Sequence, residues 1–239
     1  LASSMGDDKT RSAALSAMPR VARIGTDFFQ FLEEVQGFRG WGRGLRNAAG
    51  HWYTEKDPQK LAYQLCKYRQ RNGWSHRDVL RLASPKSPTP AHNALFRWVC
   101  TDGKKMGERE VTRKEKGSRE EVVSRYEAVD GNALPELVGY FSEVQRAESV
   151  KDMIRAIQNC KSISWEMIPT EFLKKPEVWE ALLPHNLPLT ALVRNLGRMT
   201  AHGLLQPLSD AVQTAVSHIT NADTIHRSRL HPVKILIAL

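Results

Sequence analysis

The sequence predicts an all-α protein, on three observations. Helix start signals recur along the chain, apolar residues repeat three and four positions apart behind them, and no stretch alternates with period two for long enough to predict a strand. With 41% apolar residues among 239, the chain has enough material for a core and for about a dozen helices of ordinary length. Short helices with one apolar face bury it in a bundle or in a stack of helix pairs, and the short Pro, Gly and Asn breaks favour the stack.

Helix start signals occur at five points. Asp57-Pro58 and Thr89-Pro90 place a capping side chain before a proline, which suits the first helical turn because the N–H that proline lacks has no partner there. Three pairs have the spacing of capping boxes: Ser75/Asp78, Ser118/Glu121 and Ser149/Asp152. We expect helices to begin at these positions.

Apolar residues at helical spacing predict where the helices run. They fall within residues 28–35, 41–52, 61–68, 95–99, 122–129, 134–141, 153–157, 189–199 and 208–219. The segment 101–117 interrupts this pattern because it mixes charges of both signs and holds hardly any apolar residue. We expect a mobile loop or a frayed helix there, within one helical-repeat domain that spans residues 1–239.

The charge is unevenly distributed along the chain. Residues 1–100 hold 16 Lys and Arg against 8 Asp and Glu, whereas residues 101–239 hold 19 against 18, so nearly all of the net charge of +9 lies in the first part. A field concentrated in this way attracts a polyanion, with nucleic acid the first candidate and an anionic membrane surface the second. The alternative is a basic charge that serves only solubility.

Composition also excludes several classes of protein. The longest aliphatic run, 235–239, is far shorter than the roughly 20 residues of a membrane span, so we expect the chain not to cross a bilayer. Of the two polyanions, we expect RNA and no membrane as the partner. Cys66, Cys100 and Cys160 are too few and too scattered for a disulfide framework or a zinc site, which indicates small core residues in a reducing, cytoplasmic setting. The chain opens at Leu1 rather than Met, and we expect a cut or a boundary within a longer protein there.

The strongest local charge imbalance lies in the segment 57–86. Its only acids are Asp57 and Asp78, against seven basic residues. These seven are Lys60, Lys67, Arg69, Arg71, Arg77, Arg81 and Lys86. One continuous helix would place four polar side chains on a single stripe beside an apolar stripe of Leu61, Leu65 and Tyr68. The four are Lys60, Gln64, Lys67 and Arg71.

Asn72-Gly73 is a turn signal that separates this stripe from a second basic face. After the turn, Arg77 and Arg81 stand four positions apart on the outer side of a new helix, while Val79, Leu82 and Ala83 are expected to pack inward. The turn therefore brings two basic faces together.

The turn also carries two rings. Trp74 can stack on a base, and the His76 imidazole can hydrogen-bond to a phosphate or a base edge, which is the chemistry that holds RNA. The alternative to an RNA-binding role is a structural one, in which Trp74 packs in the core and His76 caps a helix.

The segment 67–82, KYRQRNGWSHRDVLRL, resembles the Ro ribonucleoprotein family, whose shared module is called TROVE. Further stretches agree in the same order: 40–46, 189–200, and Leu230-His231-Pro232 followed by 235–239. The likeness extends from about Gly40 to the last residue. It implies a closed ring of HEAT-like helical repeats that binds small Y RNAs on its outer surface and the ends of misfolded RNAs at its central hole.

The resemblance further implies RNA quality control rather than catalysis, with RNA-processing nucleases reached through the RNA. Full-length Ro proteins have more repeats ahead of the matched region and a von Willebrand factor A domain after it. The metal motif of that domain, Asp-x-Ser-x-Ser, does not occur in this sequence. Either the missing repeats belong to a longer form of this chain, or a short member of the family completes its ring by other means, such as self-association.

The family's Y RNA contacts correspond to Lys67, Arg71, His76 and Arg77, which the charge pattern selects as well. Four arginines in the other matched stretches are expected to line the hole or the nearby surface, together with Asn195. They are Arg43, Arg46, Arg194 and Arg198. For the last two, a merely solvated helix face is the alternative.

Motifs of enzymes are absent from the sequence. No two histidines have zinc spacing, the stretch 40–44 lacks the register of a nucleotide-binding loop, and there is no Gly-x-Ser-x-Gly. We expect no catalytic residue, no metal and no cofactor. Two functions stay open, an RNA-binding scaffold and a helical-repeat module that binds other proteins, and they differ in the salt dependence of binding.

Overall fold

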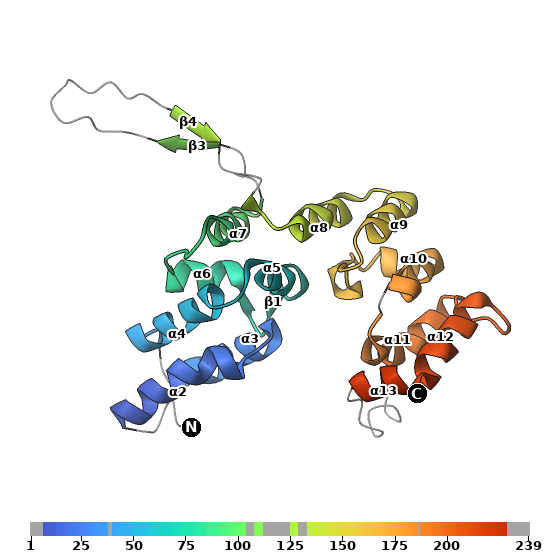
Figure 1. Cartoon of the computed structure of the whole chain (residues 1–239), viewed down its shortest axis with the longest axis horizontal. Coiled ribbons are helices and arrows are strands. Elements are labelled where there is room, and N and C mark those ends of the chain that lie inside the picture. Colours follow the sequence, from blue (N-terminus) through green and yellow to red (C-terminus); the bar gives the residue numbers. More distant parts are fainter. Residues whose placement is uncertain are drawn as a thin grey trace. The chain divides into compact units, whose positions relative to one another are not determined.

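The structure is a computed structural model that describes residues 7–37, 40–103, 108–111, 125–128, 133–185 and 187–228. These residues form twelve α-helices, α2 to α13, together with three short 3-10 helices and two two-stranded sheets (Figure 1). The predicted all-α fold class is confirmed. The chain divides into two compact units, Leu1–Val138 and Gly139–Leu239.

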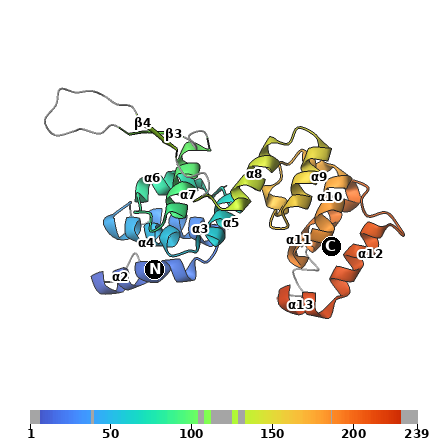
Figure 2. The same ribbon diagram turned by 45° about the horizontal axis from the view of Figure 1, so that its top comes forward.

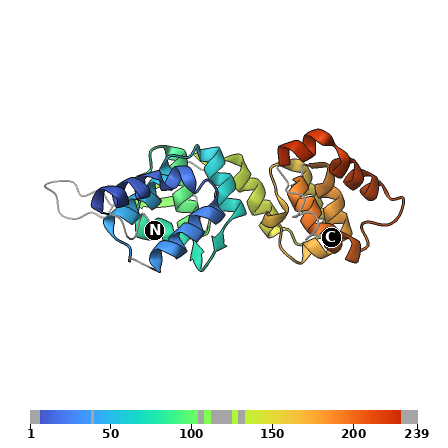
Figure 3. The same ribbon diagram turned by 90° about the horizontal axis from the view of Figure 1, so that it is seen from below.

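In its described residues the first unit contains six complete helices, and their contacts join near neighbours in the sequence. α2 packs on α4, α4 on α6, and α5 and α6 both pack on α7. Figure 3 shows these helices, blue to green, side by side. Their bounds are α2 (Asp8–Val21), α3 (Gly25–Gln36), α4 (Arg43–Thr54), α5 (Pro58–Lys67), α6 (His76–Ala83) and α7 (Pro90–Thr101).

Stacked aromatic rings form the centre of this unit. Phe28 of α3 lies parallel to Trp52 of α4, with ring centroids 4.3 Å apart, and Tyr53 meets Phe28 edge-on at 5.6 Å. All three rings are fully buried, together with Phe29. Large buried rings of this kind supply much of the hydrophobic stabilisation of a small core.

Side-chain caps fix where several helices begin, as predicted. Asp57 accepts hydrogen bonds from the backbone N–H of Gln59 and Lys60 ahead of α5, and Thr89 accepts from the N–H of His92 in α7. Each bond satisfies an N–H that has no partner inside the helix.

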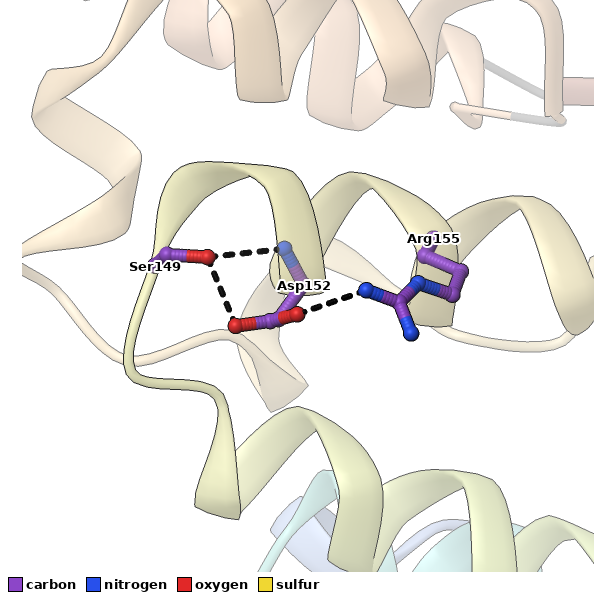
Figure 4. A network of polar contacts seen from close by, with 3 residues as sticks. All are labelled: Ser149, Asp152 and Arg155. Carbon is purple, nitrogen blue, oxygen red and sulfur yellow. Dashed lines mark hydrogen bonds and ion pairs between the residues drawn. The ribbon is translucent and has the colours of Figure 1, made fainter.

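The serine caps behave in the same way. Ser75 and Asp78 form a complete capping box at the start of α6. In Figure 4, Ser149 accepts from the Asp152 N–H and donates to the Asp152 carboxylate, which also binds Arg155 at 2.8 Å. Ser118 lies outside the described residues.

Two hairpins depart from the expectation that the chain has no strands. β1 (Gln70–Arg71) and β2 (Trp74–Ser75) pair antiparallel across Asn72 and Gly73, whose φ values are +53° and +74°. Two positive φ angles in a two-residue loop are the geometry that Asn-Gly favours, because glycine has no Cβ to clash there.

The second hairpin corrects two predictions. β3 (Glu108–Val111) pairs with β4 (Arg125–Ala128), with Arg109 opposite Glu127. The described part of the segment 101–117 therefore contains a strand rather than a loop or frayed helix, and the helix expected within 122–129 is wrong where β4 lies. Helical spacing of apolar residues does not reveal that another segment offers a pairing edge.

The second unit is helical throughout its described part (Figure 2). α9 packs on α10, and α11, α12 and α13 contact one another. α8 begins before the boundary of the units and continues into this one. The elements are α8 (Glu136–Arg146), α9 (Val150–Asn159), η2 (Trp165–Met167), η3 (Phe172–Lys174), α10 (Pro176–Leu182), η4 (Leu183–His185), α11 (Leu189–Ala201), α12 (Asp210–Thr220) and α13 (Ala222–Ser228).

Burial in the second unit follows the predicted apolar spacings with two exceptions, Leu208 and Val216, of which Val216 is 51% exposed on α12. Trp179 is fully buried and donates its indole N–H to the carbonyl of Leu173 at 2.8 Å. Leu208, expected on the inner face of a helix, precedes α12 and is 91% exposed. In the ranges that the structure covers, no helix is long and apolar enough to cross a membrane.

Candidate nucleic-acid interface

The β1–β2 hairpin connects α5 to α6, and basic residues lie on both helices and on β1. α5 ends at Lys67, and Arg71 lies on β1 opposite Trp74. The predicted single stripe from Lys60 to Arg71 is therefore wrong, since its last member belongs to the hairpin. Gln64 serves the fold instead, because its side-chain oxygen accepts from the Gly25 N–H at 2.8 Å.

Arg71, Arg77 and Arg81 are exposed around this hairpin. Among the residues with described placement, none of the three takes part in an ion pair. Burial raises the pKa of the Cys100 thiol in α7, and the charges of Arg81 and Arg77 oppose that rise. Arg77 and Arg81 both belong to α6 and are both exposed, in agreement with the outer face that their spacing of four predicts.

Arg69 is already engaged within the protein. Its guanidinium binds the Asp102 carboxylate at 2.7 Å, and both side chains are about half exposed. Arg69 and Arg77 border one open cavity of about 410 Å³, together with Trp98 of α7 and the ends of the hairpin. The hairpin thus brings these two predicted residues together, with one of them neutralised in part.

His76 corrects the expectation of an imidazole available to RNA. It is 2% exposed, and its Nδ1 is 2.9 Å from the hydroxyl of Tyr53. The centroid of its ring lies 4.6 Å from the ring centroid of Phe29. Burial lowers the pKa of His76 to about 3, so the ring is neutral at physiological pH. The capping alternative is also wrong, because Ser75 and Asp78 make the cap.

Two other side chains of the segment differ from expectation. Trp74 is half-buried and meets Trp41 edge-on, with ring centroids 5.3 Å apart. It is therefore not a fully buried core residue, and its ring is already in contact with another aromatic side chain. Leu82 is 38% exposed, and Leu80 is buried beside Val79 in its place. The inner face of α6 is therefore formed by His76, Val79 and Leu80 rather than by Val79, Leu82 and Ala83.

The remaining predicted residues lie on several different elements. Lys67 is half-buried and donates to the hydroxyl of Tyr63 at 3.2 Å, while Lys60 and Lys86 are exposed. Arg43 and Arg46 are exposed at the start of α4 in the first unit.

Arg194 and Arg198 are exposed on α11 and belong to the second unit. Asn195, between them, is buried and donates to the Ala191 carbonyl at 2.8 Å. It is therefore a structural residue of α11 and not a surface one.

Several residues of this region escape sequence reasoning. Tyr53 lies 23 positions before His76 and hydrogen-bonds to its ring, and no local signal in the sequence marks it. Arg20, Arg23 and Lys56 line one cavity with Lys60. Their basic charge was the only signal for these three, and it is scattered over separate segments. The described part of the chain has no group of three or more His, Cys, Asp or Glu placed to hold a metal.

A family model for the TROVE domain matches residues 3–239. The chain belongs to the TROVE family. This TROVE chain is 33% identical over 260 residues to the RNA-binding protein RO60 of Caenorhabditis elegans, an alignment that covers 95% of this chain and 40% of the relative. It is 32% identical over 229 residues to the RNA-binding protein RO60 of Deinococcus radiodurans, with 95% of this chain and 38% of the relative covered.

A solved structure is similar as well. The crystal structure of the Deinococcus radiodurans RO (RSR) protein superposes on the TROVE chain with a TM-score of 0.75 and 30% identity, over 99% of this chain and 43% of that one. The predicted family is confirmed. The TROVE chain spans about two fifths of the length of these relatives.

Proposed function

We propose that this chain is an RNA-binding scaffold of the Ro type and that its first unit binds structured RNA at the hairpin surface, defined as Arg71, Arg77 and Arg81. The observation that carries the proposal is that these exposed arginines lie on the hairpin and on the helix that directly follows it, while none of them, in the described ranges, is held in an ion pair. Relatives named as RNA-binding proteins support it. Unpaired arginines on a rigid frame suit phosphate oxygens, which they contact in a bidentate manner.

The RNA ligand that we propose is a small Y-like RNA, with the ends of misfolded RNAs as a second class. In this proposal the chain holds RNA for quality control in the cytoplasm and does not cleave it, and RNA-processing nucleases meet it through the bound RNA. Self-association would complete a ring. RNA that copurifies with the chain, once sequenced, tests the ligand class directly.

A salt titration tests the hairpin surface through Arg71, together with Lys67 at the adjoining end of α5. Replacing Lys67 and Arg71 by Ala should flatten the log–log dependence of RNA affinity on salt by about one to two units, because each lost phosphate contact removes a slope of ~0.7 to 0.9. Fluorescence anisotropy with a labelled stem-loop RNA measures this. The exposed pair Lys174 and Lys175 of the second unit, replaced by Ala, is a control with the same change in charge.

An unchanged slope for K67A/R71A would remove these residues from the interface. Binding that varies little with salt even in the wild-type chain would favour a module that recognises protein partners, since interfaces built on apolar anchors release few counterions.

A further inference from the structure

A second basic site lies at the other end of α5, away from the hairpin. A cavity of about 600 Å³ opens between the end of α2, the α4–α5 connection and the outer side of α5. Among the residues whose placement is described, four cations line it, Arg20, Arg23, Lys56 and Lys60, and no carboxylate does. We call these four residues the α2–α5 cradle. The remaining lining residues are Pro19, Gln59, Tyr63 and Gln64.

Internal partners do not neutralise the cradle. In the part of the chain with described placement, none of its four cations forms an ion pair. The two acids that flank Lys56 in the sequence have other partners: Glu55 lies 3.0 Å from His51, and Asp57 accepts from the start of α5. Burial lowers the pKa of Lys56, which the charge of Glu55 partly opposes. An anion in the cavity would relieve the cost of keeping these charges close together.

The backbone that carries the cradle is rigidly held. Trp52 donates its indole N–H to the Ala22 carbonyl at 2.6 Å, between the two arginines, and the Lys56 carbonyl lies 2.9 Å from Nε2 of the buried His92. Lys56 Nζ sits 4.1 Å above the ring of Trp52. These bonds order the site before a ligand arrives, so binding would cost little conformational entropy.

One side-chain hydrogen bond links the wall of the cradle to the hairpin end of the same helix. Tyr63 lines the cavity, and its hydroxyl accepts from Lys67 one turn further along α5. Cations therefore follow α5 from the cradle towards the hairpin. A linear polyanion fits such a row better than an isolated small anion does.

We propose that the α2–α5 cradle binds a phosphodiester group of RNA, as a site separate from the hairpin surface. The proposal rests on the proposed RNA-binding function. The cations would surround the phosphate, and Pro19 and the Tyr63 ring supply apolar wall for the adjoining ribose. Arg20 and Arg23 are the residues on which this site depends most, because both are exposed and neither forms part of the core.

The test compares three double variants of the full chain: R20Q/R23Q in the cradle, R77Q/R81Q at the hairpin surface, and K174Q/K175Q as a matched control. The probe is a fluorescein-labelled stem-loop RNA with a single-stranded tail, titrated at several salt concentrations. We expect R20Q/R23Q to weaken binding about tenfold at moderate salt and to flatten the salt slope by about one unit. The control should leave both unchanged.

Each outcome decides between the proposals. If R77Q/R81Q flattens the slope and R20Q/R23Q does not, the cradle is overturned and the hairpin surface stands. If neither variant differs from the control, both are overturned. Protection of Lys56 and Lys60 from acetylation by the bound RNA, read by mass spectrometry against exposed Lys151, is the second readout, and equal modification with and without RNA contradicts the cradle.

Discussion

The buried and exposed sides of the segment 57–86 have different physical roles, although their residues alternate in the sequence. His76 is inside the aromatic cluster with Tyr53 and Phe29, and the next residue, Arg77, is on the surface. The buried side holds the hairpin and α6 in place through packing and a hydrogen bond. The exposed side offers cations to a ligand. A loss of RNA binding can therefore arise from either side, and only stability and salt dependence together tell which.

The largest expected effect is on the buried side. His76→Ala should lower the free energy of unfolding by about 3 kcal/mol, because it leaves a cavity among rings and a buried Tyr53 hydroxyl without its partner. Urea unfolding measures this. The salt slope of RNA binding by the folded variant should stay that of the wild type. A flattened slope with normal stability would instead show that the imidazole contacts RNA.

Low pH should lower the free energy of unfolding of the wild-type chain through the same buried residue, His76. The pKa of His76 is about 3 in the folded chain and near 6.5 when unfolded, so below pH 6.5 the unfolded state takes up a proton that the folded state refuses. Stability from this group is complete above pH 6.5 and falls as the pH drops, by about 2 kcal/mol at pH 5. Unfolding curves at pH 7 and pH 5 should show this loss, and His76→Gln should remove it. An equal loss in that variant would assign it to other groups.

The smallest expected effect concerns the exposed arginines of α6. Arg77→Ala with Arg81→Ala should weaken RNA binding about tenfold, near 1.4 kcal/mol, and change the free energy of unfolding by less than about 0.5 kcal/mol. Arg194 and Arg198 have the same spacing on α11 and make a matched pair in the second unit. Their replacement should matter less, because no hairpin is described beside them. Equal losses would show that spacing on a helix is sufficient and that the hairpin contributes nothing.

Local rules predicted much of the fold. Caps at Asp57, Ser75, Thr89 and Ser149 depend on neighbours within three residues, and each was confirmed. The strands β1 and β2 are only two residues long, so period-two alternation had no length over which to appear, although the turn itself was predicted.

The candidate site was harder to predict because burial depends on distant partners. His76 belongs to the core because rings from α3 and α4 enclose it, and nothing near it in the sequence records that. The spacing between Lys67 and Arg71 is helical and predicts a helix that includes Arg71. The helix ends at Lys67 instead, because the residues on either side of the Asn72-Gly73 turn pair as strands. Likewise Arg69 meets Asp102 only through the packing of α7.

The helix caps of the segment 57–86 have a consequence for how its affinity can change. Both of its acidic residues, Asp57 and Asp78, are held at the first turn of a helix, where their oxygens accept backbone N–H bonds. Asparagine caps a helix about as well as aspartate does. Asp57→Asn would therefore remove one negative charge beside Lys56 and Lys60 while α5 keeps its cap. Single substitutions of this kind can raise the affinity of the segment for an anion, with little of the stability loss that usually accompanies such engineering.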